Sequence, residues 1–491
     1  MPPTGPDPHQ GPSAGDRDSG LRRDTAVGRM TIATLTIGSG IAILDGTVVN
    51  IALRRIGIDL GASLAELQWI SNGYLLSLAS LILVGGALGD RLGRRRVYLL
   101  GVAGFAVCSA LCAFAQSPLQ LVVFRILQGV AAALMTPGAL AIIQSSFRQE
   151  DRAGAIGTWA GWSGIAVALG PFVGGFLVEH AGWRWVFAIN LPLCAAVLLL
   201  GSRLPESRDE EAPRHFDYRG AISGVLVLGV TTYLLTSWRA IPPAVLVVGG
   251  LLVVAASWAF VVLERRPGAM APLSMFGSRV FRAANLMTLL VYGALGGVLF
   301  FLVLQLQVSA GYDAIGAGVA TLPIPLTMLL LSSRTSVVAA RTGPRLPMTV
   351  GPIVCAAGVL LLSGVDADTS YWTGVYPGIQ VFSLGLVMLV SPLTVAVLAA
   401  VPGNHAGVAS GVNNAVARAG GLLAVAALPA IVGLVGAEYR DPVALTSGYH
   451  QALLISAAML AVGGVVSWVG LREVGRLQET GRPPIEETHR A

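Results

Sequence analysis

The sequence predicts an all-α integral membrane protein with fourteen transmembrane helices, arranged as two six-helix halves with two extra helices between them. The first observation is composition: 54% of the 491 residues are hydrophobic and only 12% are charged, against about 25% charged residues in an ordinary soluble domain. The second is a mean hydropathy of +0.72, and the third is a repeat of short loop sequences. Together they exclude a disordered chain, a nucleic-acid-binding domain and a typical soluble enzyme.

The individual helices are predicted from apolar runs, because a membrane-spanning helix needs about 20 mainly apolar residues. The runs cover residues 31–53, 69–89, 97–115, 119–143, 153–178, 184–201, 219–237, 243–263, 284–308, 314–338, 346–365, 373–400, 407–436 and 447–471. The two longest connections, 202–218 and 264–283, are charged and fall on the same predicted side. No connection carries a nucleophile, metal-binding or phosphate-binding motif. We therefore expect neither an enzyme nor a metal site.

The arginines predict the orientation of the helices. Most of them fall in the tails and in the loops on the side of the two termini, whereas few fall on the opposite side; these few are Arg54, Arg55, Arg184, Arg239 and Arg440. Cytoplasmic loops of membrane proteins carry such an excess of basic residues. We therefore expect both termini in the cytoplasm, with residues 1–28 as a disordered tail and 472–491 as a second tail. The same placement explains the basic pI without a nucleic-acid partner.

Two pairs of similar loops divide the chain into halves. Residues 89–95 (GDRLGRR) resemble residues 339–345 (AARTGPR), and the stretch from Met135-Thr136-Pro137 to 153–157 resembles the stretch from Val390-Ser391-Pro392 to 406–411. Both pairs relate helices eight positions apart, so two helices are inserted between six-helix repeats. The predicted parts are 29–201, the linker and inserted helices 202–264, and 265–471. Parallel halves related by an axis along the membrane normal are typical of transporters, with the substrate path between them.

The first motif follows the second predicted helix and reads GGALGDRLGRRR over residues 85–96. It resembles the signature of the major facilitator superfamily in the loop between helices 2 and 3, which implies the fold of that superfamily. The resemblance assigns a cytoplasmic latch between the halves to Gly86, Gly89, Asp90, Arg91, Gly93 and Arg94. Gly86 and Gly89 would let the helix approach a neighbour closely, and an arginine or a helix N-terminus could hold the charge of Asp90. The second copy has Ala340 in place of Asp90.

The second motif places Arg125 inside the fourth predicted helix, in the sequence RILQG. An arginine within a spanning helix costs about 2.5–3.5 kcal/mol on insertion scales and normally faces a partner or a wet cavity. The motif resembles the arginine motif of the superfamily, which implies a part in proton transfer.

The third motif, GIAVALGPFVGG over residues 164–175, lies on the fifth predicted helix. It resembles the signature that marks antiporters within the superfamily, carried here by Gly164, Gly170, Pro171, Gly174 and Gly175. Gly-Pro bends a helix and small residues permit close packing. A simple helix-packing face, without any link to antiport, is the alternative.

The fourth motif is LDGTVVNIAL over residues 44–53, and it resembles the first-helix motif of the fourteen-helix drug:proton antiporter branch. Asp45 is the only carboxylate in the middle of a predicted helix. Burial disfavours the charged form of a carboxyl group, so we expect Asp45, assisted by Arg125, to bind and release the coupling proton. Asp45 could instead be a structural partner of a buried arginine. Arg54 replaces the proline that usually ends this motif, which leaves the outer end of the helix undefined.

In the second half, Asn413, Asn414 and Arg418 lie on the thirteenth predicted helix. With Asn50 they could line the cavity, or the asparagines could form hydrogen bonds between helices. The lack of a mid-helix carboxylate in this half disfavours a dicationic substrate.

The resemblance implies a proton-coupled exporter of drugs or antibiotics in a bacterial inner membrane. We expect a lipophilic small-molecule substrate, a surrounding of membrane lipid, the proton as coupling ion without any cofactor, no nucleic-acid partner, and a monomer. The alternatives are an exporter of an endogenous metabolite, peptide or amino acid, and an uptake symporter, which the third motif disfavours.

Overall fold

The computed structural model describes residues 20–208, 217–238, 241–266, 273–401, 406–434 and 436–471, and their regular elements are helices. The long ones are α1 (Ala26–Asp59), α2 (Leu64–Leu92), α3 (Arg94–Ala113), α4 (Pro118–Ser146), α5 (Gln149–His180), α8 (Tyr218–Ser237), α9 (Pro243–Glu264), α10 (Arg279–Val308), α12 (Pro323–Thr342), α13 (Arg345–Leu362), α14 (Tyr376–Ala399), α15 (Ala406–Ile431) and α16 (Pro442–Gly470). The short ones are α6 (Trp185–Ala188), α7 (Asn190–Gly201) and α11 (Ala314–Thr321).

Within these residues, twelve helices are long and apolar enough to cross a membrane. The predicted ranges 153–178 and 184–201 correspond to α5 and to the pair α6–α7. The predicted helices 184–201 and 314–338 correspond to the apolar helices Trp185–Gly201 and Ala314–Ser332. Each has one turn residue, Ile189 or Leu322, which keeps right-handed helical backbone angles. Pro192 and Pro323 follow these residues, and a proline cannot donate a backbone hydrogen bond within the helix.

The predicted tail 1–28 is too long by several residues. Leu21 forms a backbone bridge with Phe147. The Leu21 amide donates a hydrogen bond to the Ser146 carbonyl oxygen, and the Arg148 amide donates one to the Leu21 carbonyl oxygen. Thr25 then caps α1 by accepting a hydrogen bond from the Gly28 amide. The remaining predicted tail residues, 1–19 and 472–491, lie outside the described residues.

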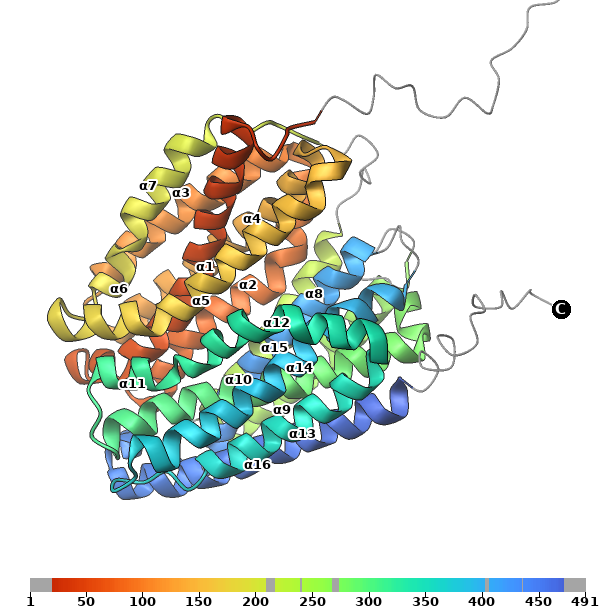
Figure 1. Cartoon of the computed structure of the whole chain (residues 1–491). Coiled ribbons are helices and arrows are strands. Elements are labelled where there is room, and N and C mark those ends of the chain that lie inside the picture. The colour runs from red at the N-terminus through yellow and green to blue at the C-terminus, as the bar shows by residue number, and fades with distance from the viewer. Residues whose placement is uncertain are drawn as a thin grey trace, which may run out of the picture.

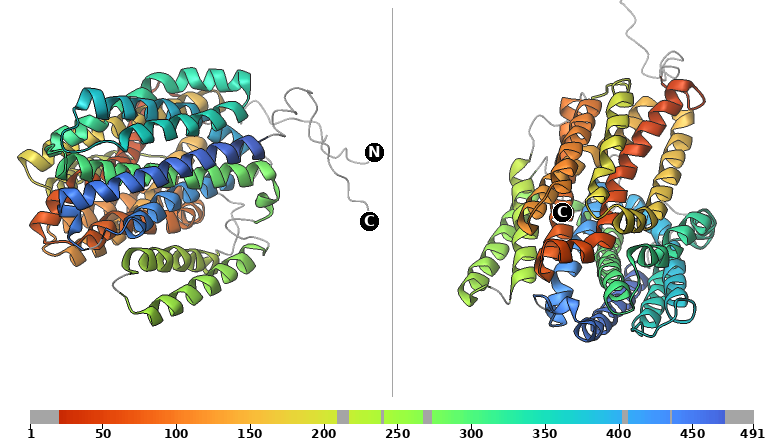
Figure 2. Two further views of the ribbon diagram at one scale, coloured as in Figure 1. Left: turned by 90° about the horizontal axis from the view of Figure 1, so that it is seen from below. Right: turned by 90° about the vertical axis from the view of Figure 1, so that its left-hand side faces the viewer.

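The helices form two bundles, α1–α7 and α10–α16, which lie side by side (Figure 1). We call the end of the molecule that holds the α2–α3 turn at Gly93 and the start of α1 the basic end. The end that holds the α1–α2 turn at Gly61 and the α15–α16 connection at Gly436 is the distal end. The pair α8–α9 lies at the edge of the molecule (Figure 2) and packs through α8 on α2 and α15. Only 6% of the apolar window of α9 is buried.

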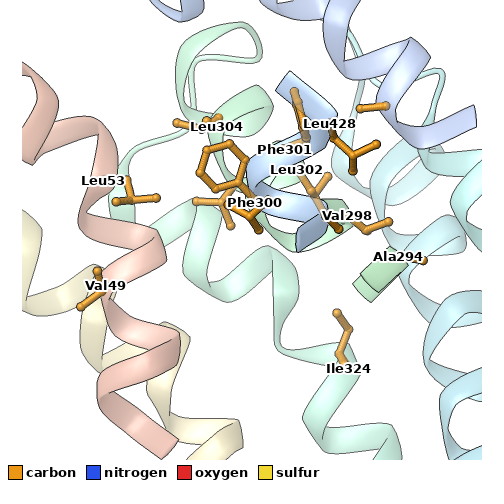
Figure 3. Close-up of a cluster of buried hydrophobic side chains, with 14 of the residues drawn as sticks. Val49, Leu53, Ala294, Val298, Phe300, Phe301, Leu302, Leu304, Ile324 and Leu428 are labelled. Carbon is orange, nitrogen blue, oxygen red and sulfur yellow. The ribbon is translucent and has the colours of Figure 1, made fainter. Parts of the chain in front are cut away.

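The two bundles share an apolar core at the distal end. Val49 and Leu53 of α1 belong to the same buried cluster as Phe300 and Leu304 of α10 and Leu428 of α15 (Figure 3). A second cluster, which includes Ile32, Tyr98, Ile143 and Leu204 near the basic end, contains residues of the first bundle alone. The apolar core therefore joins the bundles at the distal end.

The two related turns at the basic end have the same backbone conformation. Gly93 ends α2 with φ of 111°, and Gly343 ends α12 with φ of 77°. Residues other than glycine rarely adopt these angles. Each glycine is followed within two residues by the start of the next helix, α3 or α13, as expected from the repeat of residues 89–95 in 339–345.

Candidate functional site

A buried ionic network occupies the middle of the first bundle. Nη1 of Arg125 on α4 donates a hydrogen bond to Oδ2 of Asp45 on α1, and the two side chains form an ion pair. Gln128 and Asn190 each donate a hydrogen bond of 3.0 Å to the other carboxylate oxygen, Oδ1. Ser109 on α3 accepts hydrogen bonds from both amides, at 2.7 and 3.2 Å. These five side chains are at most 1% exposed, so we call them the Asp45 network.

The Arg125 guanidinium forms further hydrogen bonds and also contacts two aromatic rings. Nε donates to the carbonyl oxygen of Ile70 at 3.1 Å, and Nη1 donates to Oε1 of Gln128 at 2.6 Å. The guanidinium carbon lies 4.3 Å from the centre of the Tyr74 ring and 5.7 Å from that of Phe187. Buried charges persist only when they are paired and hydrogen-bonded in this way.

The structure brings together the two residues that the sequence assigns to proton coupling, and it adds three that the prediction missed. Gln128 lies one turn from Arg125 in the same motif, so its spacing could have indicated it. Ser109 and Asn190 lie in apolar stretches of α3 and at the start of α7. A polar side chain in a spanning helix often forms a bond between helices, and this was the available signal for both.

The four residues predicted to line a cavity have different surroundings. Asn413 donates hydrogen bonds to Asn285 and Thr288 of α10, at 3.2 and 2.8 Å, and so joins two helices of the second bundle. Asn50 accepts a hydrogen bond of 3.3 Å from Ser71. Asn414 is exposed and donates a hydrogen bond to the Ser410 carbonyl oxygen, within its own helix. Arg418 is partly exposed, and its Nε is buried without a hydrogen bond.

The predicted latch residues lie at the basic end, where α2 turns into α3. Asp90 forms an ion pair of 2.8 Å with Arg94, and Arg91 is in the last turn of α2. A side chain at Gly93 would meet the carboxylate of Glu206, which accepts a hydrogen bond of 3.0 Å from the Arg95 amide. Glu206 therefore attaches the segment after α7 to this turn.

The prediction placed the close approach of this helix to a neighbour at Gly86 and Gly89, and these positions were wrong. A Cβ atom at either glycine would make ordinary contacts of 3.7 Å with Pro137 or 3.8 Å with Arg94. A Cβ at Gly85 would instead clash with the carbonyl group of Ala133 on α4. The closest approach of α2 and α4 is therefore at the neighbouring residue, which points to a different side of the helix.

The predicted antiporter glycines hold α5 between α1 and α11. Side chains at Gly170 and Gly174 would clash with Thr47 and Val48 of α1, and one at Gly175 would clash with the backbone of Ala314 in the second bundle. In return, a side chain at Gly318 would clash with the carbonyl oxygen of Pro171. Gly164 is also on α5, but its burial and contacts lie outside the described part of the structure. These contacts connect the second bundle to the turn of α1 that carries Asp45.

Hydrogen bonds join the bundles at the distal end. Arg440 donates to the carbonyl oxygens of Gly57 and Ala62, at 2.7 and 3.1 Å, and Tyr439 donates to that of Ala62 at 3.0 Å. Gln68 of α2 donates to the Val425 carbonyl oxygen of α15 at 2.6 Å. We call the contacts of Tyr439 and Arg440 with the α1–α2 turn the distal clamp.

Comparison with known proteins identifies the family. The family model described as "Major Facilitator Superfamily" matches residues 35–219. The tetracenomycin C resistance and export protein of Streptomyces glaucescens is 36% identical over 84% of this chain and 78% of its own. The methylenomycin A resistance protein of Bacillus subtilis is 32% identical over 91% of this chain and 95% of its own. The chain belongs to the major facilitator superfamily.

Solved structures show that the fold agrees with membership of the major facilitator superfamily. A bacterial homologue of the human lysosomal transporter Spinster, in an inward-facing and unoccupied conformation, has a TM-score of 0.64 and 17% identity, covering 94% of this chain and all of its own. A peptide transporter in complex with sulfate has a TM-score of 0.69 and 15% identity, covering 95% and 99%. A major facilitator chain is a transporter rather than an enzyme.

Proposed function

We propose that this major facilitator protein is a proton-coupled exporter of drugs or antibiotics, which carries substrate out and protons in by alternating access. The observation that carries the proposal is the ion pair of Asp45 and Arg125, buried at the centre of the Asp45 network. Support for the substrate class comes from relatives named for resistance to, or export of, tetracenomycin C, methylenomycin A and puromycin.

In this proposal, the proton binds to an oxygen of the Asp45 carboxylate. The ionised form is stabilised by Arg125, Gln128 and Asn190, while enclosure in an apolar bundle disfavours any unpaired charge. Protonation would remove the charge that holds Arg125, and a change in the Asp45–Arg125 separation would then change proton affinity. Thr47 and Val48 contact α5, which contacts α11. Motion of the second bundle would therefore reach Asp45 through α5.

The proposed topology has fourteen spanning helices in a bacterial inner membrane, with the basic end and both termini in the cytoplasm. The structure then corresponds to a state closed toward the outside by the distal clamp. Asp90 and its loop would latch the bundles together at the basic end in the opposite state. The coupling ion is the proton, the substrate is lipophilic, and the protein works as a monomer without a cofactor.

The test is transport by the purified protein in liposomes with an imposed pH gradient and a panel of lipophilic dyes and antibiotics. We expect substrate accumulation that follows the gradient and collapses with a protonophore. Transport independent of the gradient would exclude proton coupling. Transport of amino acids or peptides in place of the panel would favour the metabolite exporter, for which the probable actinorhodin transporter of Streptomyces coelicolor is a related case at 34% identity.

A further inference from the structure

Arg418 of α15 differs from Arg125 in having no counter-charge. In the residues that the structure describes, it takes part in no ion pair, and its buried Nε makes no hydrogen bond. A guanidinium group has five N–H donors and no acceptor, and a cation inside a spanning segment is normally paired. Asp45, which could neutralise it, is already bound to Arg125 and two amides.

The position of Arg418 is at the boundary between the bundles. Seven residues before Arg418, a side chain at Gly411 would meet Leu83 of α2, and seven residues after it the Val425 carbonyl oxygen accepts a hydrogen bond from Gln68 of α2. Positions seven apart share a helix face, so Arg418 lies on the face of α15 that packs against α2. A Cβ at Gly421, one turn after Arg418, would lie 3.6 Å from the carbonyl oxygen of Tyr292 on α10.

Arg418 and the residues that pack α15 most closely on α10 point to different sides of the helix. These residues are Asn413, which donates a hydrogen bond to Asn285, and Gly420, where a Cβ would clash with the Leu289 carbonyl oxygen. Asn414 is four residues before Arg418, so the two side chains share a face of the helix. Asn414 is exposed, and Arg418 and Tyr292 are partly exposed. A small molecule could therefore reach the side chains of Arg418 and Asn414 together.

We propose that Arg418 binds an anionic oxygen group of the exported substrate, so that the protein selects amphiphiles carrying a carboxylate. Arginine is suited to this because its planar fork binds such groups through two parallel hydrogen bonds. The apolar body of the substrate would lie against Tyr292, and Asn414 would add a further donor. This inference rests on the proposed function, which it narrows to acidic substrates.

The test uses two probes that share the anthracene ring and differ in charge and one methyl group: 9-anthracenecarboxylate and its methyl ester. Binding to the purified protein in nanodiscs of phosphatidylcholine is followed by the fluorescence anisotropy of the anthracene group near neutral pH. We expect the wild type to bind the carboxylate about tenfold more tightly than the ester, because a charged hydrogen-bonded pair stabilises a complex by about that factor. In Arg418→Gln the two affinities should become equal, while the ester still binds.

Two further variants control for charge and folding. Arg418→Lys should keep part of the preference for the carboxylate, and Arg334→Gln, which removes an exposed arginine of α12, should leave it unchanged. An unchanged preference in Arg418→Gln, or no preference in the wild type, would overturn the inference. Gradient-driven transport of uncharged dyes is measured separately. If the wild type transports these dyes and Arg418→Gln keeps the preference for the carboxylate, only the role of Arg418 is rejected. If the wild type does not transport them, the proposed function is rejected.

Discussion

Arg440 donates a hydrogen bond of 2.7 Å to the carbonyl oxygen of Gly57, so the connection between α15 and α16 is fixed to the last turn of α1. A side chain at Gly57 would also clash with the hydroxyl group of Tyr439. The bond therefore joins the two bundles where they lie close together, and any separation of the bundles at the distal end must break it.

We expect Arg440→Ala to shift the protein toward a state that is open at the distal end. Spin labels on cysteines at the exposed residues Ile58 and Val443 should then report a second, longer distance in double electron–electron resonance. Arg55→Ala removes an exposed arginine that pairs with Asp59 inside α1, and it should leave the distance distribution as in the wild type. An identical distribution in Arg440→Ala would show that the distal clamp does not hold the state.

Asp45→Asn should abolish substrate-induced proton release. The amide cannot bind and release a proton, so a pH dye should detect release from wild-type protein in detergent and almost none from the variant. The matched control is Asp59→Asn, which changes an exposed carboxylate on the same helix. Equal release from wild type and Asp45→Asn would place the coupling group elsewhere.

Removal of one partner of the Asp45–Arg125 pair should destabilise the fold more than removal of both. A buried charge without its partner costs about 3–5 kcal/mol, so Arg125→Gln alone should unfold at a clearly lower temperature. Asp45→Asn combined with Arg125→Gln should recover roughly half of that loss or more. The four cysteines are buried, so a thiol-reactive dye can follow thermal unfolding. Additive losses would mean that the pair contributes no coupling energy.

Gly170→Leu should abolish transport, because its side chain would enter the space of Thr47 and displace α1 from α5. Gly157→Leu is the matched control on the same helix, since nothing lies within 4 Å of a Cβ atom there. Pro171→Ala should have a milder effect, as it restores a backbone donor without filling space. Normal transport by Gly170→Leu would contradict the packing role of this helix.

Gly85→Ala should destabilise the protein, whereas Gly86→Ala should be nearly neutral. The first change places a methyl group against the Ala133 backbone, and the second makes only a contact of 3.7 Å with Pro137. Thermal unfolding of the two variants in detergent separates these outcomes. Equal stability would mean that α2 and α4 can move apart at Gly85.

Much of the fold can be predicted from the sequence, because the apolar runs and the related turns at Gly93 and Gly343 depend on local sequence. The pairing of Asp45 with Arg125 also follows, since an apolar bundle leaves each charge few other partners. Ser109 and Asn190 were missed because their depth and direction depend on the rotation of α3 and α7. Rotation also explains why the close approach is at Gly85 and not at Gly86, and why Asn413 faces α10 while Asn414 does not.

All five members of the Asp45 network lie on helices of residues 26–201. Among the residues that the structure describes, none of their hydrogen bonds is made with a side chain of the second bundle. Substitutions at Arg418 or Asn414 of the second bundle should therefore change the proposed substrate contacts without removing a hydrogen bond of the Asp45 network.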